Sequence, residues 1–468
     1  MMRLTAVTAA SLVLAGCASF SPDGGMGKVT ELTKERTGVA VGAQRSQRDV
    51  DTARGRVAEI LKQPLSADTA VELALLNNRG LQARFSELGI AESDLVQVGR
   101  LRNPVFSFGR LALGGSAVEI ERSVMFDLLS VLTMPVARQV QQHHFEQAQF
   151  LAAYEAVGVA SQTRLAYFGA VAAQELVTYF QQVKEAADAS NELARRMVLA
   201  GNFNKLAQLR EQAFHADATS GLARAQQQAV VERERLTRLL GLSAEQADFK
   251  LPERLPDLPR QPMEPANAEQ TALEKRLDVL MARRSMEATA KSLGLTKATR
   301  FVDALELGYQ NRSETGEPRA NGYTVELPLP LFDFGSVRTA RAEATYLQAV
   351  HRTAEVALNA RSEVRQSYSA YRTAYDLARH YRDEVVPLRK RISEENLLRY
   401  NGMLIGVFEL LADSGEQVRS VAASVQALRD FWVAETDLQS ALTGRSPGAG
   451  SASGPSASAA PAEGGAGH

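Results

Sequence analysis

Residues 321–335 read Asn-Gly-Tyr-Thr-Val-Glu-Leu-Pro-Leu-Pro-Leu-Phe-Asp-Phe-Gly, and within this stretch the hydrophobic pattern changes from that of a strand to that of a helix. Tyr323, Val325 and Leu327 alternate with the polar residues Thr324 and Glu326, as in a strand with one apolar and one polar face. The two prolines that follow end the strand, because proline cannot donate a hydrogen bond to a neighbouring strand.

The chain after Asp333 has the pattern of a very long helix, and we expect Asp333 to be its N-cap. A helix of about 65 residues would be about 100 Å long at a rise of 1.5 Å per residue, which is more than a globular domain needs. The apolar or small positions recur at intervals of three and four, or sums of these, as in a coiled-coil seam: Ala340, Ala344, Leu347, Val350, Ala354, Ala357, Val364, Tyr368, Tyr371, Tyr375, Ala378, Val385, Leu388 and Ile392.

The same change of pattern occurs earlier, in residues 117–127. Val118, Ile120, Val124 and Phe126 alternate with other residues, and a long helix is expected from about 136 to 200. Corresponding features lie about 200 residues apart, which predicts two tandem structural repeats. The corresponding features are Asp127 with Asp333, Gly201 with Gly402, residues 240–241 with 442–444, and residues 78–81 with 275–279.

The N-terminus has the features of a secreted lipoprotein. Arg3 precedes an apolar run that is too short to span a membrane, and the run ends in Leu14-Ala-Gly-Cys17, a lipobox. We therefore predict a signal peptide over residues 1–16 and a covalent lipid anchor on Cys17. Ala18 resembles the residue that follows the lipidated cysteine in lipoproteins sent to the outer membrane. The alternative is a signal peptide whose cysteine is incidental.

Cys17 is also the only cysteine, so no disulfide can form within the chain. The remaining segments are expected from helix, strand and proline patterns. They are an extended tether over 17–64, a first repeat over 65–249 with helices at about 66–98 and 204–240 and strands at about 105–126, a Pro-rich linker over 250–266, a second repeat over 267–444 with helices at about 268–295 and 404–442 and strands at about 301–331, a water-exposed loop over 311–321, and a disordered tail over 445–468.

These elements predict a fold that is mainly α-helical with a small β part. In each repeat the two shorter helices together match the length of the long one, so we expect them to stack end to end beside it. Four strands cannot close a membrane barrel, which needs at least 8 strands. Three copies of the chain would supply twelve strands to a shared barrel.

The order of these motifs resembles the outer membrane efflux (TolC-like) family over about residues 65–444. The segments that carry the resemblance are the lipobox, the strand–helix pairs, Leu329-Pro-Leu-Phe-Asp-Phe-Gly335, Ala200-Gly-Asn202 and Arg399-Tyr-Asn-Gly402. The resemblance implies a homotrimer with a 12-stranded β-barrel in the bacterial outer membrane and a coiled-coil helical tunnel in the periplasm. It also implies two partners, a periplasmic adaptor protein and an inner-membrane efflux pump.

In that family the helix turns at the periplasmic tip meet the adaptor. The resemblance places an adaptor-docking tip at Gly201, Asn202, Tyr400 and Gly402, where each glycine also suits a left-handed helix end; the alternative is that both glycines are only caps. Family members carry an acidic residue about six positions after each tip glycine. Those positions are near Ala207 and Phe408 in this chain, and the charged neighbours Arg399, Glu409 and Asp413 are the candidates for the tunnel mouth.

The strand alternation also predicts which side chains face lipid and which face water. We expect a lumen lined by Glu119, Glu121, Glu306 and Glu326, which would favour cations. The side chains on the other face of each strand are expected to face lipid, and they are Val118, Ile120, Leu305, Leu307, Val325 and Leu327.

Composition and motifs favour a conduit over an enzyme. With 53 basic and 54 acidic residues the net charge is −1, so the chain has no net positive charge to attract nucleic acid. The sequence has no phosphate-binding loop, no Gly-x-Ser-x-Gly and no His-Glu-x-x-His motif. His143 and His144 are adjacent, so on a helix they diverge and do not chelate one metal ion. We expect no metal and no cofactor other than the lipid.

Two alternatives to an efflux channel remain open at the level of sequence. One is a structural periplasmic coiled-coil lipoprotein whose strands stay outside the bilayer. The other is the outer-membrane exit duct of a type I protein secretion system. A ligand ladder on Tyr368, Tyr371 and Tyr375 is a further possibility, although tyrosines at helical spacing more often pack in a seam.

Overall fold

The computed structural model describes residues 19–112, 117–201, 204–302 and 304–446, except for the side chains of residues 244, 407, 408 and 411. The chain divides into two compact units, and each unit combines residues from both predicted repeats. Unit 1 comprises Met1–Glu31, Ala83–Ala153 and Asp278–Leu358. Unit 2 comprises Leu32–Gln82, Tyr154–Leu277 and Asn359–His468.

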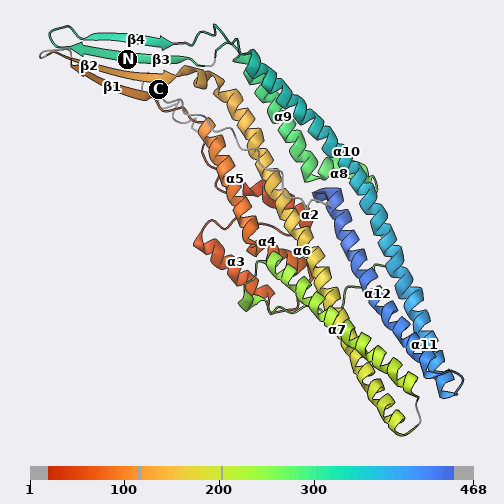
Figure 1. Cartoon of the computed structure of the whole chain (residues 1–468). Helices are drawn as coiled ribbons and strands as arrows, with labels where there is room; N and C mark the ends of the chain where they lie inside the picture. The colour runs from red at the N-terminus through yellow and green to blue at the C-terminus, as the bar shows by residue number, and fades with distance from the viewer. Residues whose placement is uncertain (1–18, 113–116, 202–203, 303, 447–468) are drawn as a thin grey trace. The chain divides into compact units, whose positions relative to one another are not determined.

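Unit 1 contains a four-stranded antiparallel sheet in the order β1-β2-β3-β4 (Figure 1). Its two central strands come from different repeats and pair with Val124 opposite Tyr309. The loop predicted over 311–321 is shorter than expected, because Asn311 is held by hydrogen bonds to Arg122 (3.0 Å) and Asn321 (2.6 Å) on the neighbouring strands. The strands are β1 (Val105–Ala112), β2 (Val118–Asp127), β3 (Glu306–Glu314) and β4 (Ala320–Glu326).

The rest of the described chain is mostly helical. None of its helices combines the length and the apolar character needed to cross a membrane. Helices α2, α5, α6, α9 and α10 contribute residues to both units. The helices are α2 (Met26–Thr37), α3 (Gln47–Ile60), α4 (Ala67–Asn77), α5 (Arg79–Val98), α6 (Leu128–Leu199), α7 (Lys205–Leu240), α8 (Ala268–Lys275), α9 (Leu277–Ala298), α10 (Ser336–His380), α11 (Val386–Asn401) and α12 (Val407–Gln439).

The first helix of each repeat is broken where an unbroken helix was expected. Asn78 separates α4 from α5 in an extended conformation, and its side-chain amide donates to the Leu239 carbonyl oxygen at 3.0 Å. Arg276 separates α8 from α9 in the same conformation, and its buried guanidinium lies 2.8 Å from the carboxylate of Glu363. The two breaks occupy corresponding places in the two repeats. In both cases the backbone amide keeps its helical bond, to Ala74 or Ala272, and the side chain makes a tertiary contact that a periodic pattern does not show.

The two long helices also differ in detail from the expected ones. Helix α6 begins at Leu128 rather than near residue 136, because Asp127 accepts a hydrogen bond from the Ser130 amide at 2.9 Å and Pro135 is tolerated inside the helix. The second long helix is interrupted by a π-helical turn at Tyr381–Val385. Pro387 follows this turn and lacks the N–H that a regular α-helix would use.

Residues 17–64 are not the extended tether that was predicted. They contain α2 and α3, and α3 buries Ala53, Val57 and Ile60, which are spaced as one face of a helix. At the other end, the predicted tail begins with a packed residue. The guanidinium of Arg445 lies 4.9 Å from the centre of the Tyr154 ring, and the residue is 8% exposed.

The core of unit 2 explains the tyrosine stripe of α10. Tyr371 and Tyr375 are each 2% exposed and pack against Phe431 of α12. The Tyr375 hydroxyl donates to the Pro259 carbonyl oxygen at 3.1 Å, and the Met263 amide donates to the Tyr371 hydroxyl at 2.8 Å. These tyrosines therefore pack in the core and fix the Pro-rich linker, so a ligand ladder is the wrong interpretation.

Candidate functional site

The strand register sorts the side chains of the sheet onto two chemically different faces, since residues directly opposite each other point the same way. Glu119, Glu121, Glu306 and Glu326 share one face, as the alternation predicted. We call this the acidic face. The other, which we call the apolar face, is mostly aromatic and aliphatic; it carries no aspartate or glutamate in any of the four strands, and its charged residues are Arg110 and Arg122.

Three carboxylates form a row across the acidic face. Asp127 lies opposite Glu306, and Glu306 lies opposite Glu326. Like charges at directly opposite positions repel each other by a few tenths of a kcal/mol or more, up to about 1 kcal/mol. Arg102 partly neutralises the row, because its guanidinium lies 3.2 Å from the Asp127 carboxylate. Such a row is stable only beside water, where its charges remain solvated.

A second group on the acidic face lies toward the ends of the strands away from the helices. Glu119, 5% exposed, forms an ion pair with Arg312, and Arg312 also lies 3.8 Å from Glu314. Val105 and Leu111 are on this face too, which the sequence pattern of β1 did not settle. The acidic face thus has a partly exposed carboxylate row near the helices and a buried, paired glutamate farther away.

The apolar face is exposed in the single chain. Phe106, Phe126, Tyr323 and Val325 on this face are between 53% and 83% exposed. Val118, Ile120 and Leu307 share it. Leu305 and Leu327, which were also expected here, lie one residue outside β3 and β4.

Exposed apolar residues continue beyond the sheet into the junction with the helices. Phe332 is fully exposed, and its neighbours in the segment between β4 and α10 are also exposed. We call these residues the apolar collar: Leu101, Leu128, Val131, Leu132, Phe301, Leu329, Leu331, Phe332, Phe334 and Val337.

The turn into α10 depends on a glycine rather than on the predicted N-cap. Asp333 accepts from the Gly335 amide at 2.9 Å, but the helix begins at Ser336, so Asp333 lies before the cap position. Gly335 has a left-handed φ of +71°, and a Cβ at this position would overlap the Arg300 carbonyl oxygen. Arg300 in turn donates to the Phe334 carbonyl oxygen at 2.9 Å.

The first helix turn of unit 2 ends as predicted. Gly201 has a φ of +76° and donates to the Val198 carbonyl oxygen at 3.0 Å, which is the bonding of a glycine just past a helix end. Asn202 lies outside the described residues. Asn204 caps α7 by accepting from the Ala207 amide at 2.8 Å, and Ala207 is 2% exposed.

The second turn corrects the prediction made for Gly402. Its φ is −79°, and the left-handed residue is Met403 with a φ of +60°. The Met403 amide donates to the Tyr400 carbonyl oxygen at 3.0 Å, and the Leu404 amide donates to that of Arg399 at 2.9 Å. This pair of bonds places Met403 at the position normally taken by glycine. The turn is therefore displaced by one residue from the predicted place.

The three candidates for the tunnel mouth lie in different environments. Arg399 is exposed and lies 3.4 Å from Glu395 on the same helix, and Glu409 is exposed in the first turn of α12. Asp413 is 7% exposed, and its Oδ2 has no hydrogen-bond partner among the described residues. Phe408 can be placed only by its backbone.

Met197 of α6 and Tyr400 of α11 line one cavity, so the two helix turns lie at the same end of unit 2. Cys17 lies outside the described residues, as does the hairpin turn predicted at Gly114-Gly115. Within the described residues, no three His, Cys, Asp or Glu side chains are grouped as a metal site would require.

Comparisons with known proteins identify the fold. Residues 269–393 match the sequence model of the outer membrane efflux protein family. No curated protein matches the chain. Among solved structures, the CmeC outer membrane channel of Campylobacter jejuni is similar with a TM-score of 0.70 and 15% identity, covering 80% of this chain and 85% of that one.

Two further solved structures have the same fold. The MtrE outer membrane channel of Neisseria gonorrhoeae, in its open state, gives a TM-score of 0.66 at 15% identity over 80% of this chain and 88% of that one. CusC, described with transmembrane channel formation, gives 0.68 at 16% identity over 81% and 92%. The predicted fold class, mainly helical with a small four-stranded sheet, is confirmed.

Proposed function

We propose that this chain, which belongs to the outer membrane efflux protein family, is the outer-membrane channel of a tripartite efflux system. Three copies form a conduit that accepts substrates from an inner-membrane pump and a periplasmic adaptor protein and releases them outside the cell. The observation that carries the proposal is the two-faced sheet of unit 1, which is too small to close on itself.

The sheet needs partners at both edges. In the described residues β1 and β4 each pair with a neighbour on one side only, which leaves two rows of unpaired backbone groups. Unpaired edges are not tolerated in the hydrocarbon of a bilayer, and a closed barrel removes them. Four strands are too few for a membrane barrel, which needs at least about 8, whereas three chains supply twelve.

In such a barrel each face of the sheet lies in an environment that suits its side chains. The apolar face meets lipid, because its exposed aromatic and aliphatic side chains would otherwise contact water. The acidic face lines the lumen, where water solvates the row of Asp127, Glu306 and Glu326. Three chains place three such rows around one pore, which favours passage of cations.

The apolar collar supports the same orientation. Its residues lie shortly before or after the strands in the sequence, at the end of the sheet that joins the helices, so in a barrel they lie at the membrane–periplasm boundary, where exposed Phe332 and Phe334 reach the edge of the lipid. The helices then extend into the periplasm. A structural lipoprotein outside the bilayer would leave both the apolar face and the collar in water.

Cys17 is the proposed lipid anchor in the outer membrane, supported by the lipobox. Radiolabelled palmitate should be incorporated into the wild-type protein but not into Cys17→Ala. Equal labelling of the wild-type and Cys17→Ala proteins would contradict the proposed lipid anchor. Because one acyl chain binds a membrane only weakly, the barrel should keep the Cys17→Ala protein inserted.

The helix turns around Gly201, Asn202, Tyr400 and Gly402 are the proposed contact with the adaptor, with Arg399, Glu409 and Asp413 near the tunnel mouth. Supporting this, Met403 and Leu404 are 93% and 77% exposed, so the second turn offers apolar side chains to a partner. Leu404→Gln should reduce site-specific cross-linking to the adaptor while the trimer stays folded. Unchanged cross-linking would mean that the turns serve only as helix ends.

The function itself is tested by extraction from outer-membrane fractions. We expect a band three times the mass of the chain on unheated gels, which converts to a monomer on boiling, and loss of efflux when the gene is deleted. The type I secretion duct is distinguished in the same strain, because its loss would abolish export of a protein and leave small-molecule efflux intact. A monomer that never enters the membrane would contradict the proposal.

A further inference from the structure

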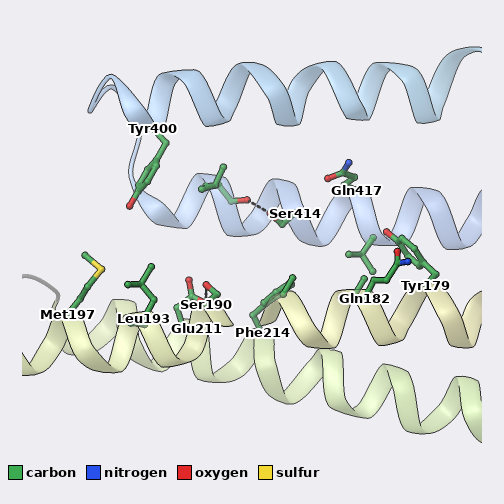
Figure 2. Close-up of a pocket in the computed structure, with 15 residues that line it drawn as sticks. Tyr179, Gln182, Ser190, Leu193, Met197, Glu211, Phe214, Tyr400, Ser414 and Gln417 are labelled. Atoms are coloured by element: carbon green, nitrogen blue, oxygen red, sulfur yellow. Dashed lines mark hydrogen bonds between the residues drawn. The ribbon is translucent and has the colours of Figure 1, made fainter. Parts of the chain in front are cut away.

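A cavity of about 520 Å³ lies in unit 2 between the pair α6–α7 and the pair α11–α12. Figure 2 shows Leu193, Met197 and Phe214 on the α6–α7 side, with Tyr400 and Gln417 on the other. This volume is within the range of small-molecule sites, which is about 300–1,000 Å³. The cavity is not part of the sheet, and among the described residues that line it Tyr400 is the only one that belongs to the proposed adaptor contact, so adaptor docking does not account for most of its lining.

Among the described residues that line this cavity, one side chain is charged. Glu211 of α7 is 3% exposed, and its Oε2 accepts a hydrogen bond from the Ser190 hydroxyl at 2.9 Å. No lysine, arginine or histidine is among the described residues that line the cavity. A buried carboxylate without a cationic partner is costly, so a cation of suitable shape would be stabilised beside it.

Aromatic side chains also line this cavity. Phe214 lies three residues after Glu211 on α7, so both side chains are on the same face of that helix. Tyr179 and Tyr400 line other parts of the cavity. Burial raises the pKa of the Tyr179 hydroxyl, which indicates a poorly hydrated wall. Aromatic rings attract cations through their faces, most strongly when the cation has lost its water.

We propose that this cavity binds a hydrophobic monovalent cation, with the charge beside Glu211 and the apolar groups against Phe214, Leu193 and Met197. A dianion or a strongly hydrated metal ion does not fit, because the wall offers one carboxylate and mostly carbon. Tyr400 and Gln417 line the opposite side of the cavity, so a cation that fills it contacts both helix pairs at once. It therefore holds α6–α7 and α11–α12 at their observed separation close to the two helix turns.

The proposal is tested by calorimetric titration of the purified full-length protein with tetraphenylphosphonium, and with tetraphenylborate as an anion of the same shape. The matched detergent buffer is titrated separately and subtracted. We expect saturable binding of the cation and none of the anion. Glu211→Gln should weaken cation binding at least about tenfold, because the carboxylate is lost while the shape of the side chain is kept.

Glu234→Gln is the matched control, since Glu234 is an exposed glutamate on α7 outside the cavity, and it should leave the affinity unchanged. Phe214→Leu keeps the apolar contact but removes the aromatic ring, and it should also weaken binding if Glu211→Gln fails to fold. Equal affinity for the anion, or a Glu211→Gln protein and a Phe214→Leu protein that both bind like wild type, would overturn the proposal. These titrations do not depend on channel activity, so they can fail while the channel function stands.

Discussion

At the scale of single residues, Gly335 controls the turn from the sheet into α10. We predict that Gly335→Ala destabilises the protein by about 1–3 kcal/mol, because alanine disfavours the left-handed φ and its Cβ overlaps the Arg300 carbonyl oxygen. The measurement is the thermal unfolding midpoint of the purified protein. Gly294→Ala is the control, since nothing surrounds that helical glycine and alanine favours helices. Equal effects of the two substitutions would contradict this account of the turn.

Met403, in the second helix turn, should lower the stability of the folded protein. Replacing it by glycine should stabilise the isolated protein by about 1 kcal/mol, because glycine has no Cβ penalty at a φ of +60° and the exposed Met403 side chain has little to lose. Gly402→Ala, at a φ of −79°, should be close to neutral. Chemical denaturation of the three proteins measures this. A Met403→Gly protein with a lower denaturation midpoint than wild type would contradict this prediction.

Asp437 of α12 gives a prediction for pH. Burial raises the pKa of its carboxyl from 3.8 to about 6. Between these values the folded protein holds a proton that the unfolded chain has released, so this residue's contribution to stability falls as pH rises from about 4 to 6 and then stays low. Asp437→Asn should remove that decline and raise stability at pH 7.5 by about 1–2 kcal/mol, a value reduced for partial solvent screening.

Thermal unfolding at pH 5 and pH 7.5 checks the Asp437 prediction. Asp430→Asn on the same helix is the control, because Asp430 is exposed and should change neither the midpoint nor its pH dependence appreciably. If the unfolding midpoint of the Asp437→Asn protein changes with pH as that of wild type does, the Asp437 carboxyl is not the cause of the pH dependence.

At the scale of elements, the faces of the sheet allow a direct comparison of neighbours. Leu307→Arg puts a charge on the apolar face and should cost about 2–4 kcal/mol in a bilayer. Glu306→Arg is on the acidic face between Asp127 and Glu326, so it should cost much less and even relieve repulsion. Urea titrations of the protein refolded into lipid vesicles compare the two. Similar losses for both would remove the lipid-facing assignment.

The strands and long helices were predictable because each has a simple period. Alternation placed Val118, Ile120, Leu307 and Val325 on one side of the sheet, and the register confirms that they share a face. The break at Asn78 was missed, although Asn78 caps α5 locally by accepting from the Leu81 amide at 3.0 Å; its second bond, to the Leu239 carbonyl oxygen, lies far away in the sequence and could not be predicted. The extension of β3 past residue 310 was missed for the same reason, because cross-strand polar contacts hold it.

The helix turns show a different limit. Sequence places glycines near helix ends, but it does not show which residue takes the left-handed conformation, and Met403 takes it although Gly402 is adjacent. The cavity around Glu211 was missed altogether. Its lining comes from four helices, and a single glutamate in a helical pattern looks like a solvated surface residue.

At the scale of the whole molecule, the order of the elements carried more information than any single motif. Two strand pairs with long helices, in two repeats, predicted the mainly helical fold, and the matches to solved channels confirm it. The sequence also predicted the need for a trimer from the number of strands. Neither the pump nor the exported substrate follows from these elements, because the acidic lumen that we propose would select by charge and width rather than by shape.

The central claim is that three chains form one cation-favouring pore lined by the acidic face. Its most direct test is the reversal potential of the purified trimer in a planar bilayer under a salt gradient. We expect a discrete conductance with cation preference, and a smaller preference when Glu306 and Glu326 are both changed to Gln. An inserted trimer without conductance, or one that prefers anions as wild type, would contradict the account.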